Sequence, residues 1–370
     1  MKKLLHRVWA EINLDALGQN LETIRRLAPN RRIMAVVKAN AYGHGVPIVA
    51  PELFRLGVRD FAVSNLEEAL ELRALLPSAE ILIFGYSDAE WFGELLGGNF
   101  IQTVGSVPFA RELSAYAGSR GVRARVHIKV NTGMARVGID TEEELSEILA
   151  LPGLRAEGIY THFSSADSLL PDDLAYTRAQ QEKLLAFAEK SGLPYYSRNS
   201  GGILYHGDFG GEWVRSGIIT YGCKPNTAEA VPEGFTPILS LKSRVCQVKE
   251  LPAGTAVSYG RTFVTDRPTT AAVIPAGYAD GYSRALSNRG AVYIGGERCP
   301  ILGRVCMDQT IVDVTGKSVR VGDTAVLYSD TIPEIKTDAV ADLLGTIGYE
   351  LLCAVGARVP RVAVRGGKVV

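Results

Sequence analysis

A lysine stands at the end of an apolar run near the N-terminus. Residues 33–38 read IMAVVK, and Lys38 is followed by the short segment ANAYGHG over residues 39–45. A lysine at the end of a buried strand is costly unless its charge is paired or lost. Such surroundings lower the pKa of the amine, and a neutral amine can form an imine with an aldehyde. Lys38 could equally be a surface residue whose ammonium reaches solvent, so it decides nothing alone.

Two segments rich in small residues could bind a phosphate group. Residues 198–202 read RNSGG and residues 215–218 read RSGI. Free backbone N–H groups at the start of a helix, with nearby hydroxyls, are suited to phosphate, although either segment could also be an ordinary turn. Together with Lys38, they indicate an aldehyde cofactor that carries a phosphate, which is pyridoxal 5′-phosphate (PLP).

The elements that must position these residues are short strands that alternate with helices. Patterns such as residues 14–28 carry apolar residues on one helical face. The alternation predicts parallel βα units up to about residue 222, and their number predicts a TIM (β/α)8 barrel. Its functional groups would lie at the C-terminal ends of the strands. A doubly wound open sheet is the alternative. The eight expected strands are 33–38, 61–64, 81–85, 101–104, 126–130, 158–161, 195–197 and 218–221.

The pattern changes near residue 236. Short β-type runs separated by Gly, Pro and Asp predict a mostly β domain over residues 236–370, interrupted by a short helix at 338–347. We expect the α/β barrel to span residues 10–235, with residues 227–234 as the linker. Residues 1–9 are expected to form an N-terminal strand that packs with the C-terminal domain.

Composition narrows the class of protein. The 370 residues include 40 Lys+Arg and 40 Asp+Glu, so the formal net charge is zero and neither nucleic acid nor an anionic membrane is expected as the main partner. No apolar stretch approaches the roughly 18 residues of a membrane span, and no apolar core of a signal peptide follows Leu5. The 5 cysteines are widely spaced without a CxxC pair, which favours reduced thiols, a cytoplasmic location and no metal site.

Seven ordered motifs resemble those of bacterial alanine racemases. They are residues 35–45 (AVVKANAYGHG), 129–138 (KVNTGMARVG), 161–167 (THFSSAD), 257–260 (VSYG), 277–281 (GYADG), 303–309 (GRVCMDQ) and 347–350 (IGYE). The resemblance implies a barrel followed by a β domain, PLP as cofactor, and a homodimer with active sites shared between subunits. It also implies the interconversion of L- and D-alanine, which supplies D-alanine for peptidoglycan.

The resemblance assigns two catalytic residues. Lys38 would carry the cofactor and act as the base on one face of the substrate α-carbon, while Tyr259 from the partner subunit would act on the opposite face. Racemisation requires one group to remove the α-proton and another to return a proton from the other side. A tyrosine needs help to lower its pKa from about 10, and a hydrogen bond from His162 would provide it.

The resemblance also assigns binding residues. Arg215 would contact the pyridine nitrogen and leave it unprotonated, which weakens the ring as an electron sink and suits racemisation. The other residues expected around the cofactor are Tyr42, His162, Asn199, Ser200, Gly217, Ile218 and Tyr349. Arg136 and the Met307 backbone would bind the substrate carboxylate, and Lys129 would be carbamylated to orient Arg136. Supporting or entrance positions are Asp167, Tyr278, Arg284, Arg304, Cys306 and Asp308.

The sequence departs from the family pattern at four positions. Tyr196 stands where many members have a histidine behind the arginine that contacts the pyridine, Asn131 replaces a common aspartate, Ser216 replaces a common proline, and Arg261 follows Tyr259 closely. Three other functions remain open: a serine or broad-specificity racemase, a non-catalytic PLP-binding protein, and a decarboxylase on the same fold. Tyr349 favours alanine over serine, because related serine racemases tend to have a smaller residue there.

Overall fold

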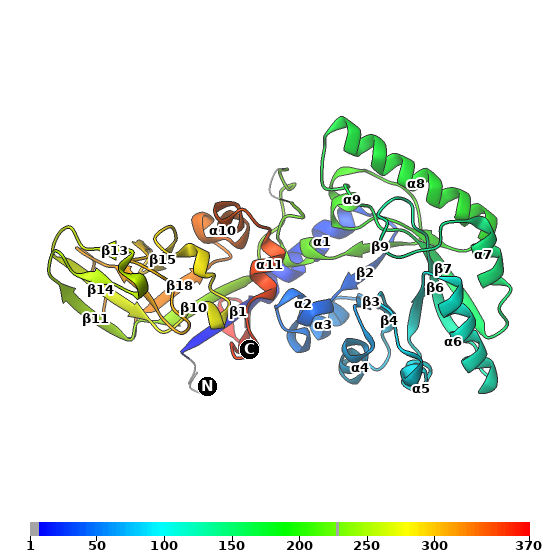
Figure 1. The fold of residues 1–370 in the computed structure, drawn as a ribbon, viewed down its shortest axis with the longest axis horizontal. Coiled ribbons are helices and arrows are strands. Elements are labelled where there is room, and N and C mark those ends of the chain that lie inside the picture. The colour runs from blue at the N-terminus through cyan, green and yellow to red at the C-terminus, as the bar shows by residue number, and fades with distance from the viewer. Residues whose placement is uncertain (1–6, 227–228) are drawn as a thin grey trace.

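The computed structural model describes residues 7–226 and 229–370, and these form two domains joined along the long axis of the molecule (Figure 1). The first two residues of the predicted linker and most of the predicted N-terminal strand lie outside the described residues. No described helix is long and apolar enough to cross a bilayer.

Eight parallel strands form the barrel of the first domain. Their order is β8-β7-β6-β5-β4-β3-β2-β9, and each named pair is parallel. The ring is closed by backbone hydrogen bonds from Glu212 to Tyr195 (2.8 Å) and from Arg215 to Arg198 (2.9 Å). The predicted TIM barrel is confirmed and the open sheet is wrong. The strands are β2 (Arg32–Val36), β3 (Asp60–Val63), β4 (Glu80–Ile83), β5 (Ile101–Val104), β6 (Ala124–Lys129), β7 (Leu154–Tyr160), β8 (Tyr195–Tyr196) and β9 (Trp213–Ser216).

The predicted eighth strand was wrong. Residues Ile218–Tyr221 form a 3₁₀ helix, η2, and the eighth strand is β9, immediately before it. A continuous apolar run of four residues cannot be assigned to a strand or to a buried helical turn by periodicity. The true strand escaped notice because it carries Arg215, whose side chain is 3% exposed inside the barrel.

The helices that cover the barrel begin where the sequence provides N-terminal caps. The side chain of Asn13 accepts hydrogen bonds from the first turn of α1, and Thr141 forms a capping box with Glu144 at α7. Buried residues such as Leu17 and Leu21 lie on the inner face of α1. The helices are α1 (Leu14–Leu27), α3 (Val46–Arg55), α4 (Leu66–Leu75), α5 (Phe92–Gly97), α6 (Val107–Ser119), α7 (Glu142–Leu149), α8 (Pro171–Ser191) and α9 (Ser200–Tyr205).

The second domain is mostly β, as predicted. Strand β1 (Val8–Asn13) pairs with β10 (Leu239–Arg244) and with β19 (Arg361–Arg365), so residues 8–13 belong to the central sheet of this domain. The seven-stranded sheet has the order β16-β15-β18-β10-β1-β19-β20, and a separate sheet has the order β11-β14-β17. The other strands of the second domain are β11 (Gln247–Leu251), β12 (Ala256–Val257), β13 (Phe263–Val264), β14 (Thr269–Ile274), β15 (Ala291–Ile294), β16 (Glu297–Pro300), β17 (Thr310–Asp313), β18 (Thr324–Tyr328) and β20 (Lys368–Val369).

Two helices of the second domain lie toward the barrel in Figure 1. They are α10 (Thr337–Leu344), where a helix was predicted, and α11 (Gly348–Cys353). The backbone of Gly43 in the barrel packs so closely on the Leu352 carbonyl of α11 that a Cβ there would overlap it. Arg361 of β19 donates to the Gly43 carbonyl at 2.9 Å. The two domains therefore meet at the segment that carries Lys38.

Candidate active site

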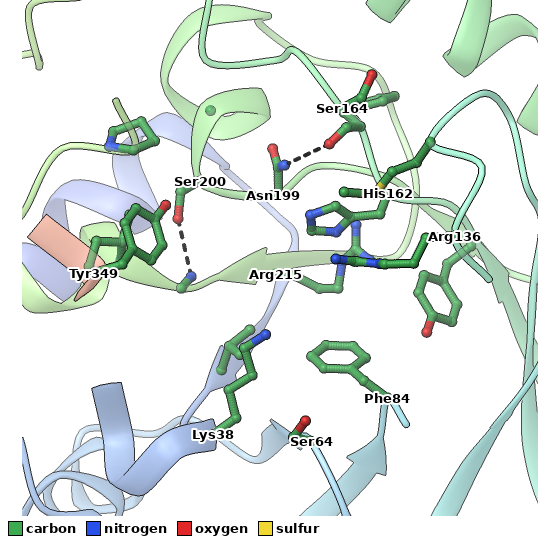
Figure 2. A pocket seen from close by; sticks show the side chains of 18 of the residues that line it. Lys38, Ser64, Phe84, Arg136, His162, Ser164, Asn199, Ser200, Arg215 and Tyr349 are labelled. Carbon is green, nitrogen blue, oxygen red and sulfur yellow. Dashed lines mark hydrogen bonds between the residues drawn. The ribbon is translucent and has the colours of Figure 1, made fainter. Parts of the chain in front are cut away.

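A cavity of about 510 Å³ lies at the C-terminal ends of the barrel strands (Figure 2). TIM barrels bind their ligands at this face. Twelve of the residues predicted from the sequence line it: Lys38, Tyr42, Lys129, Arg136, His162, Asp167, Asn199, Ser200, Arg215, Gly217, Ile218 and Tyr349.

Lys38 is placed by an unusual turn. It is the first residue of α2 (Lys38–Tyr42), not the last residue of a strand as predicted, since β2 ends at Val36. The four residues that follow Lys38 have φ angles of 51–54°, which is a left-handed helical turn and costs roughly 1–2 kcal/mol per non-glycine residue. Two side chains hold the turn by accepting hydrogen bonds from the backbone. Asn40 accepts from the Val46 N–H at 2.8 Å, and Glu68 accepts from the Ala39 N–H at 2.7 Å.

Glu68 also connects two strand ends. Its second carboxylate oxygen accepts from the Ser64 N–H at 2.7 Å, so one side chain fixes the loops after β2 and β3. Sequence reasoning missed Glu68 and Ser64. The signal for Ser64 was its position directly after a barrel strand, where functional groups gather.

Four basic side chains line the cavity, and we call them the group of four cations: Lys38, Lys129, Arg136 and Arg215. Burial, followed by the charge of Arg136, lowers the pKa of Lys38. Burial also lowers the pKa of Lys129 to about 8, with further contributions from Arg215, Arg136 and Lys38. None of the four forms a salt bridge with a carboxylate of the described residues. The site is therefore suited to a ligand that carries several negative charges.

Backbone and hydroxyl groups form a cradle at the other end of the cavity. The hydroxyl of Ser200 accepts from the Gly217 N–H at 3.3 Å, as the dashed line in Figure 2 shows. A Cβ at Gly217 would lie 2.9 Å from the Tyr42 hydroxyl, so only a glycine leaves this space open. Ser200 begins α9 and Ile218 begins η2, so N–H groups of two helical starts face a cradle that fits a phosphate.

Arg215 lies on β9 between the cradle and the barrel wall. One terminal nitrogen, Nη2, donates to the Thr161 carbonyl at 2.7 Å and to the Ser197 carbonyl at 2.6 Å. Its Nε and Nη1 have no partner among the described residues. Buried polar atoms are rarely left unpaired, so a guanidinium with two free donors indicates a ligand acceptor in the cavity.

His162 and Arg136 lie together on the side of the cavity opposite Tyr349 in Figure 2. Burial and then the charge of Arg215 lower the pKa of His162 well below its usual value, so this imidazole is neutral. Arg136 is carried by the loop after β6, which Asn131 organises. The Asn131 side chain accepts from the Ala135 N–H at 2.9 Å and donates to Asp140 at 2.8 Å.

Tyr349 comes to the cavity from the second domain. It lies in the first turn of α11, and its ring lies 5.9 Å from that of Tyr42, centroid to centroid. The C-terminal domain therefore completes the wall of the barrel cavity in the same chain.

The remaining predicted residues do not line this cavity. Tyr259, Met307 and Tyr278 are 70%, 53% and 41% exposed on the second domain. Backbone hydrogen bonds from Tyr278 to Cys306 (3.1 Å) and from Ala279 to Met307 (3.0 Å) hold this group together. Arg304, Cys306 and Asp308 are also in it, whereas Arg284 begins the short 3₁₀ helix η5 (Arg284–Leu286).

The contacts within this exposed group are well defined. The Ser258 hydroxyl donates to the Arg304 carbonyl at 2.6 Å, and Asp308 pairs with Arg358 at 2.7 Å. Tyr259 thus lies on an ordered surface, outside the cavity that contains Lys38.

Several residues that line the cavity were not predicted, among them Val36, Phe84, Met134, Tyr160 and Ser164. Phe84 follows β4 and Tyr160 ends β7, so position at a strand end was again the available signal. All five cysteines are free in the structure, and Cys223 and Cys299 are buried. No cluster of three or more potential metal ligands occurs in residues 7–226 and 229–370.

Comparisons with known proteins agree with the geometry. Residues 12–225 match the family model described as alanine racemase, N-terminal domain, and residues 238–363 match alanine racemase, C-terminal domain. The alanine racemase of Desulforamulus reducens is 42% identical over 96% of this chain and 98% of its own length. The structure of alanine racemase from Clostridium difficile 630 superposes with a TM-score of 0.93 at 34% identity, over 100% of this chain and 98% of the other.

A further structure, described as alanine racemase from Bartonella henselae with covalently bound pyridoxal phosphate, has a TM-score of 0.86 at 31% identity, over 97% of this chain and 100% of the other. Both domain models match in order, and the similarity extends over the whole length of the chain. The chain therefore belongs to the alanine racemase family.

Proposed function

We propose that this enzyme interconverts L- and D-alanine with PLP bound covalently to Lys38. The observation that carries this proposal is the convergence, in one cavity, of a lysine with a lowered pKa, a glycine-lined cradle of N–H and hydroxyl groups, and an arginine with two free donors. These groups match the aldehyde, phosphate and ring nitrogen of the cofactor. The relative from Bartonella henselae, which carries covalently bound pyridoxal phosphate, supports the same choice.

Different residues of the cavity would bind the phosphate and the ring of PLP. The phosphate is held by Tyr42, Ser200, Tyr349 and the backbone of Gly217 and Ile218. Arg215 donates to the ring nitrogen. Asn199 caps α9 by accepting from the Gly202 N–H at 3.0 Å, which keeps the helix start aimed at the cradle. When bound, PLP supplies an electron sink that makes the substrate α-proton acidic.

Two bases would act on opposite faces of the α-carbon. The Lys38 amine removes or returns a proton on one face, and the Tyr259 phenol does so on the other. In each direction one base takes the α-proton and the other gives a proton, so the net reaction is inversion alone. Arg136 binds the substrate carboxylate, and the neutral His162 imidazole donates a hydrogen bond to the phenol oxygen.

A second copy of the chain would supply Tyr259. No described residue between 226 and 348 lines the cavity around Lys38, while Tyr259 and Met307 stand exposed on the second domain. A symmetric dimer would place the exposed group of one chain over the cavity of the other. Arg136 and the partner's Met307 would then bind the carboxylate together.

The group of four cations supports a further part of the proposal, which is a modification of Lys129. A carbamate on Lys129 would turn one cation into an anion beside Arg136, and the lowered pKa of Lys129 provides the neutral amine that reacts with carbon dioxide.

The product, D-alanine, is a building block of peptidoglycan, and we propose that the enzyme supplies it in the cytoplasm.

Chiral chromatography tests the reaction itself. L-alanine and L-serine are incubated separately with the PLP-loaded protein, and the two enantiomers are quantified over time. We expect alanine to reach a racemic endpoint much faster than serine, because Tyr349 narrows the cavity. Faster turnover of serine would assign a serine or broad-specificity racemase. Inversion of neither amino acid, with cofactor bound, would indicate a PLP carrier, and release of carbon dioxide would indicate a decarboxylase.

A further inference from the structure

We propose that Tyr196 is a positioning residue for Arg215: with Tyr160 it forms a paired aromatic clamp that aims the two free guanidinium donors into the cavity. This inference rests on the proposed function, because it assigns a device to the arginine that would contact the cofactor ring.

The two tyrosines form a rigid pair. Their rings are stacked with centroids 4.9 Å apart and planes within 5° of parallel. Both side chains are fully buried in the barrel. The Arg215 guanidinium carbon lies 5.0 Å from the Tyr160 ring centroid and 5.4 Å from that of Tyr196. A desolvated cation near an aromatic ring is held more strongly than an exposed one.

Each ring is fixed by a hydrogen bond at its hydroxyl. Tyr196 contacts Nδ1 of His127 at 2.8 Å, and Tyr160 contacts the Thr103 hydroxyl at 2.9 Å. Burial lowers the pKa of His127 to about 4, so the imidazole is neutral and its Nδ1 can accept from the phenol. The Tyr196 hydroxyl is therefore engaged by His127 on β6, and its ring is what Tyr196 offers to Arg215.

The clamp leaves the charge of Arg215 available to a ligand. Besides lying near the two rings, the guanidinium hydrogen-bonds among the described residues with the carbonyls of Thr161 and Ser197, both through Nη2. No carboxylate of the described residues pairs with it. Neutral carbonyls and aromatic rings orient a cation without neutralising it, so Nε and Nη1 keep their donor strength for an acceptor in the cavity.

This arrangement gives a physical account of a departure from the family pattern. A histidine behind the arginine could accept a hydrogen bond from it, whereas the phenol of Tyr196 is bonded to His127 instead. In this chain the orientation of Arg215 would depend on the two carbonyl hydrogen bonds of Nη2 and on the tyrosine rings, with no hydrogen bond from the Tyr196 hydroxyl. The ring of Tyr196, and not its hydroxyl, is then the part that the cofactor site requires.

Three variants separate the ring from the hydroxyl and from general stability. Tyr196→Phe keeps the ring, and Tyr196→Leu removes it. Phe92→Leu is the matched control, because Phe92 is also fully buried but packs in the helical layer against Phe109 and Tyr116. Apoprotein of each form is titrated with PLP, and the dissociation constant, the absorption spectrum of the bound cofactor between pH 6 and about 10, and the thermal midpoint are measured.

We expect Tyr196→Phe to bind PLP within about threefold of the wild type, with the same spectrum and pH dependence. Tyr196→Leu should bind about tenfold more weakly and show a changed pH dependence of the cofactor band, because the donors to the ring nitrogen are misaligned. Phe92→Leu should lower the thermal midpoint without changing either cofactor readout.

The two hypotheses fail in different ways. If Tyr196→Leu keeps the affinity and spectrum of the wild type, or if Phe92→Leu changes them equally, the clamp is refuted and the proposed function stands. If Tyr196→Phe loses as much as Tyr196→Leu, the hydroxyl acts instead of the ring, which also refutes the clamp. If the wild-type apoprotein does not bind PLP, the proposed function fails and the clamp fails with it.

Discussion

If each active site takes Lys38 from one chain and Tyr259 from another, two inactive variants should restore activity when their subunits exchange. Lys38→Ala removes the barrel base, and Tyr259→Phe removes the base on the exposed surface of the second domain. Each homodimer lacks one of the two bases at both of its sites.

The size of the recovery follows from the arrangement. In a mixed dimer, one site receives both substitutions and the other receives the intact Lys38 and the intact Tyr259. Random exchange of equal amounts makes about half of the dimers mixed, and half of their sites are intact, so about a quarter of wild-type activity should return. Exchange is driven by brief incubation in mild denaturant followed by dilution with PLP, and D-alanine is measured by chiral chromatography.

A matched control excludes recovery by other means. In the control, Lys38→Ala is mixed with Arg215→Ala. Both residues line the barrel cavity of their own chain, so each of the two cavities in a mixed dimer contains one substitution and no activity should return. Mass spectrometry of the intact dimers confirms exchange. Activity that stays at the level of the separate variants after confirmed exchange would refute a site shared between subunits.

Three further predictions concern single residues. Gly217→Ala should weaken PLP binding about tenfold, since the new Cβ would lie 2.9 Å from the Tyr42 hydroxyl; cofactor titration measures this, and unchanged affinity would contradict the cradle. Tyr349→Ala should raise the kcat/KM ratio of serine to alanine about tenfold, whereas Tyr349→Phe should leave the ratio within about twofold; equal ratios in all three forms would remove the role of Tyr349 in specificity. Lys129 should add carbon dioxide increasingly as pH rises from 7 to 9, because its amine loses its proton near a pKa of about 8. A ¹³C carbamate signal with labelled bicarbonate tests this, and its presence in Lys129→Arg would assign it elsewhere.

The sequence was sufficient for the architecture of the barrel because seven of the eight strands are short apolar runs between amphipathic helices. It failed at β9, where the inward-facing residue of the strand is Arg215. Hydrophobic periodicity assumes that inward positions are apolar, and this assumption breaks down where a barrel interior is itself the binding site.

The left-handed turn after Lys38 was also beyond prediction. Of residues 39–42, only Asn40 is of a type that commonly adopts positive φ, and the turn is held by Glu68, Asn40 and the contact of Gly43 with α11. Glu68 and α11 come from other parts of the chain, so local sequence cannot reveal their contribution. The clamp of Tyr160 and Tyr196 is likewise formed by the ends of two neighbouring strands.

The twelve predicted residues that line the cavity were identified chiefly from motifs rather than from hydrophobic periodicity. Lys38 and the RNSGG and RSGI segments could be argued from chemistry alone. The roles proposed for Tyr259 and Met307 could not, because both residues are exposed in a single chain and lie outside the cavity that contains Lys38.

Hydrogen exchange at the α-carbon tests the two-base proposal most directly. The Tyr259→Phe variant, loaded with PLP, is incubated in D₂O with each enantiomer of alanine, and deuterium content and chirality are followed together. Lys38 alone should exchange the α-hydrogen of one enantiomer with retention, while inversion in both directions is lost. Inversion at the wild-type rate, or equal exchange of both enantiomers, would contradict the assignment of Lys38 and Tyr259 to opposite faces.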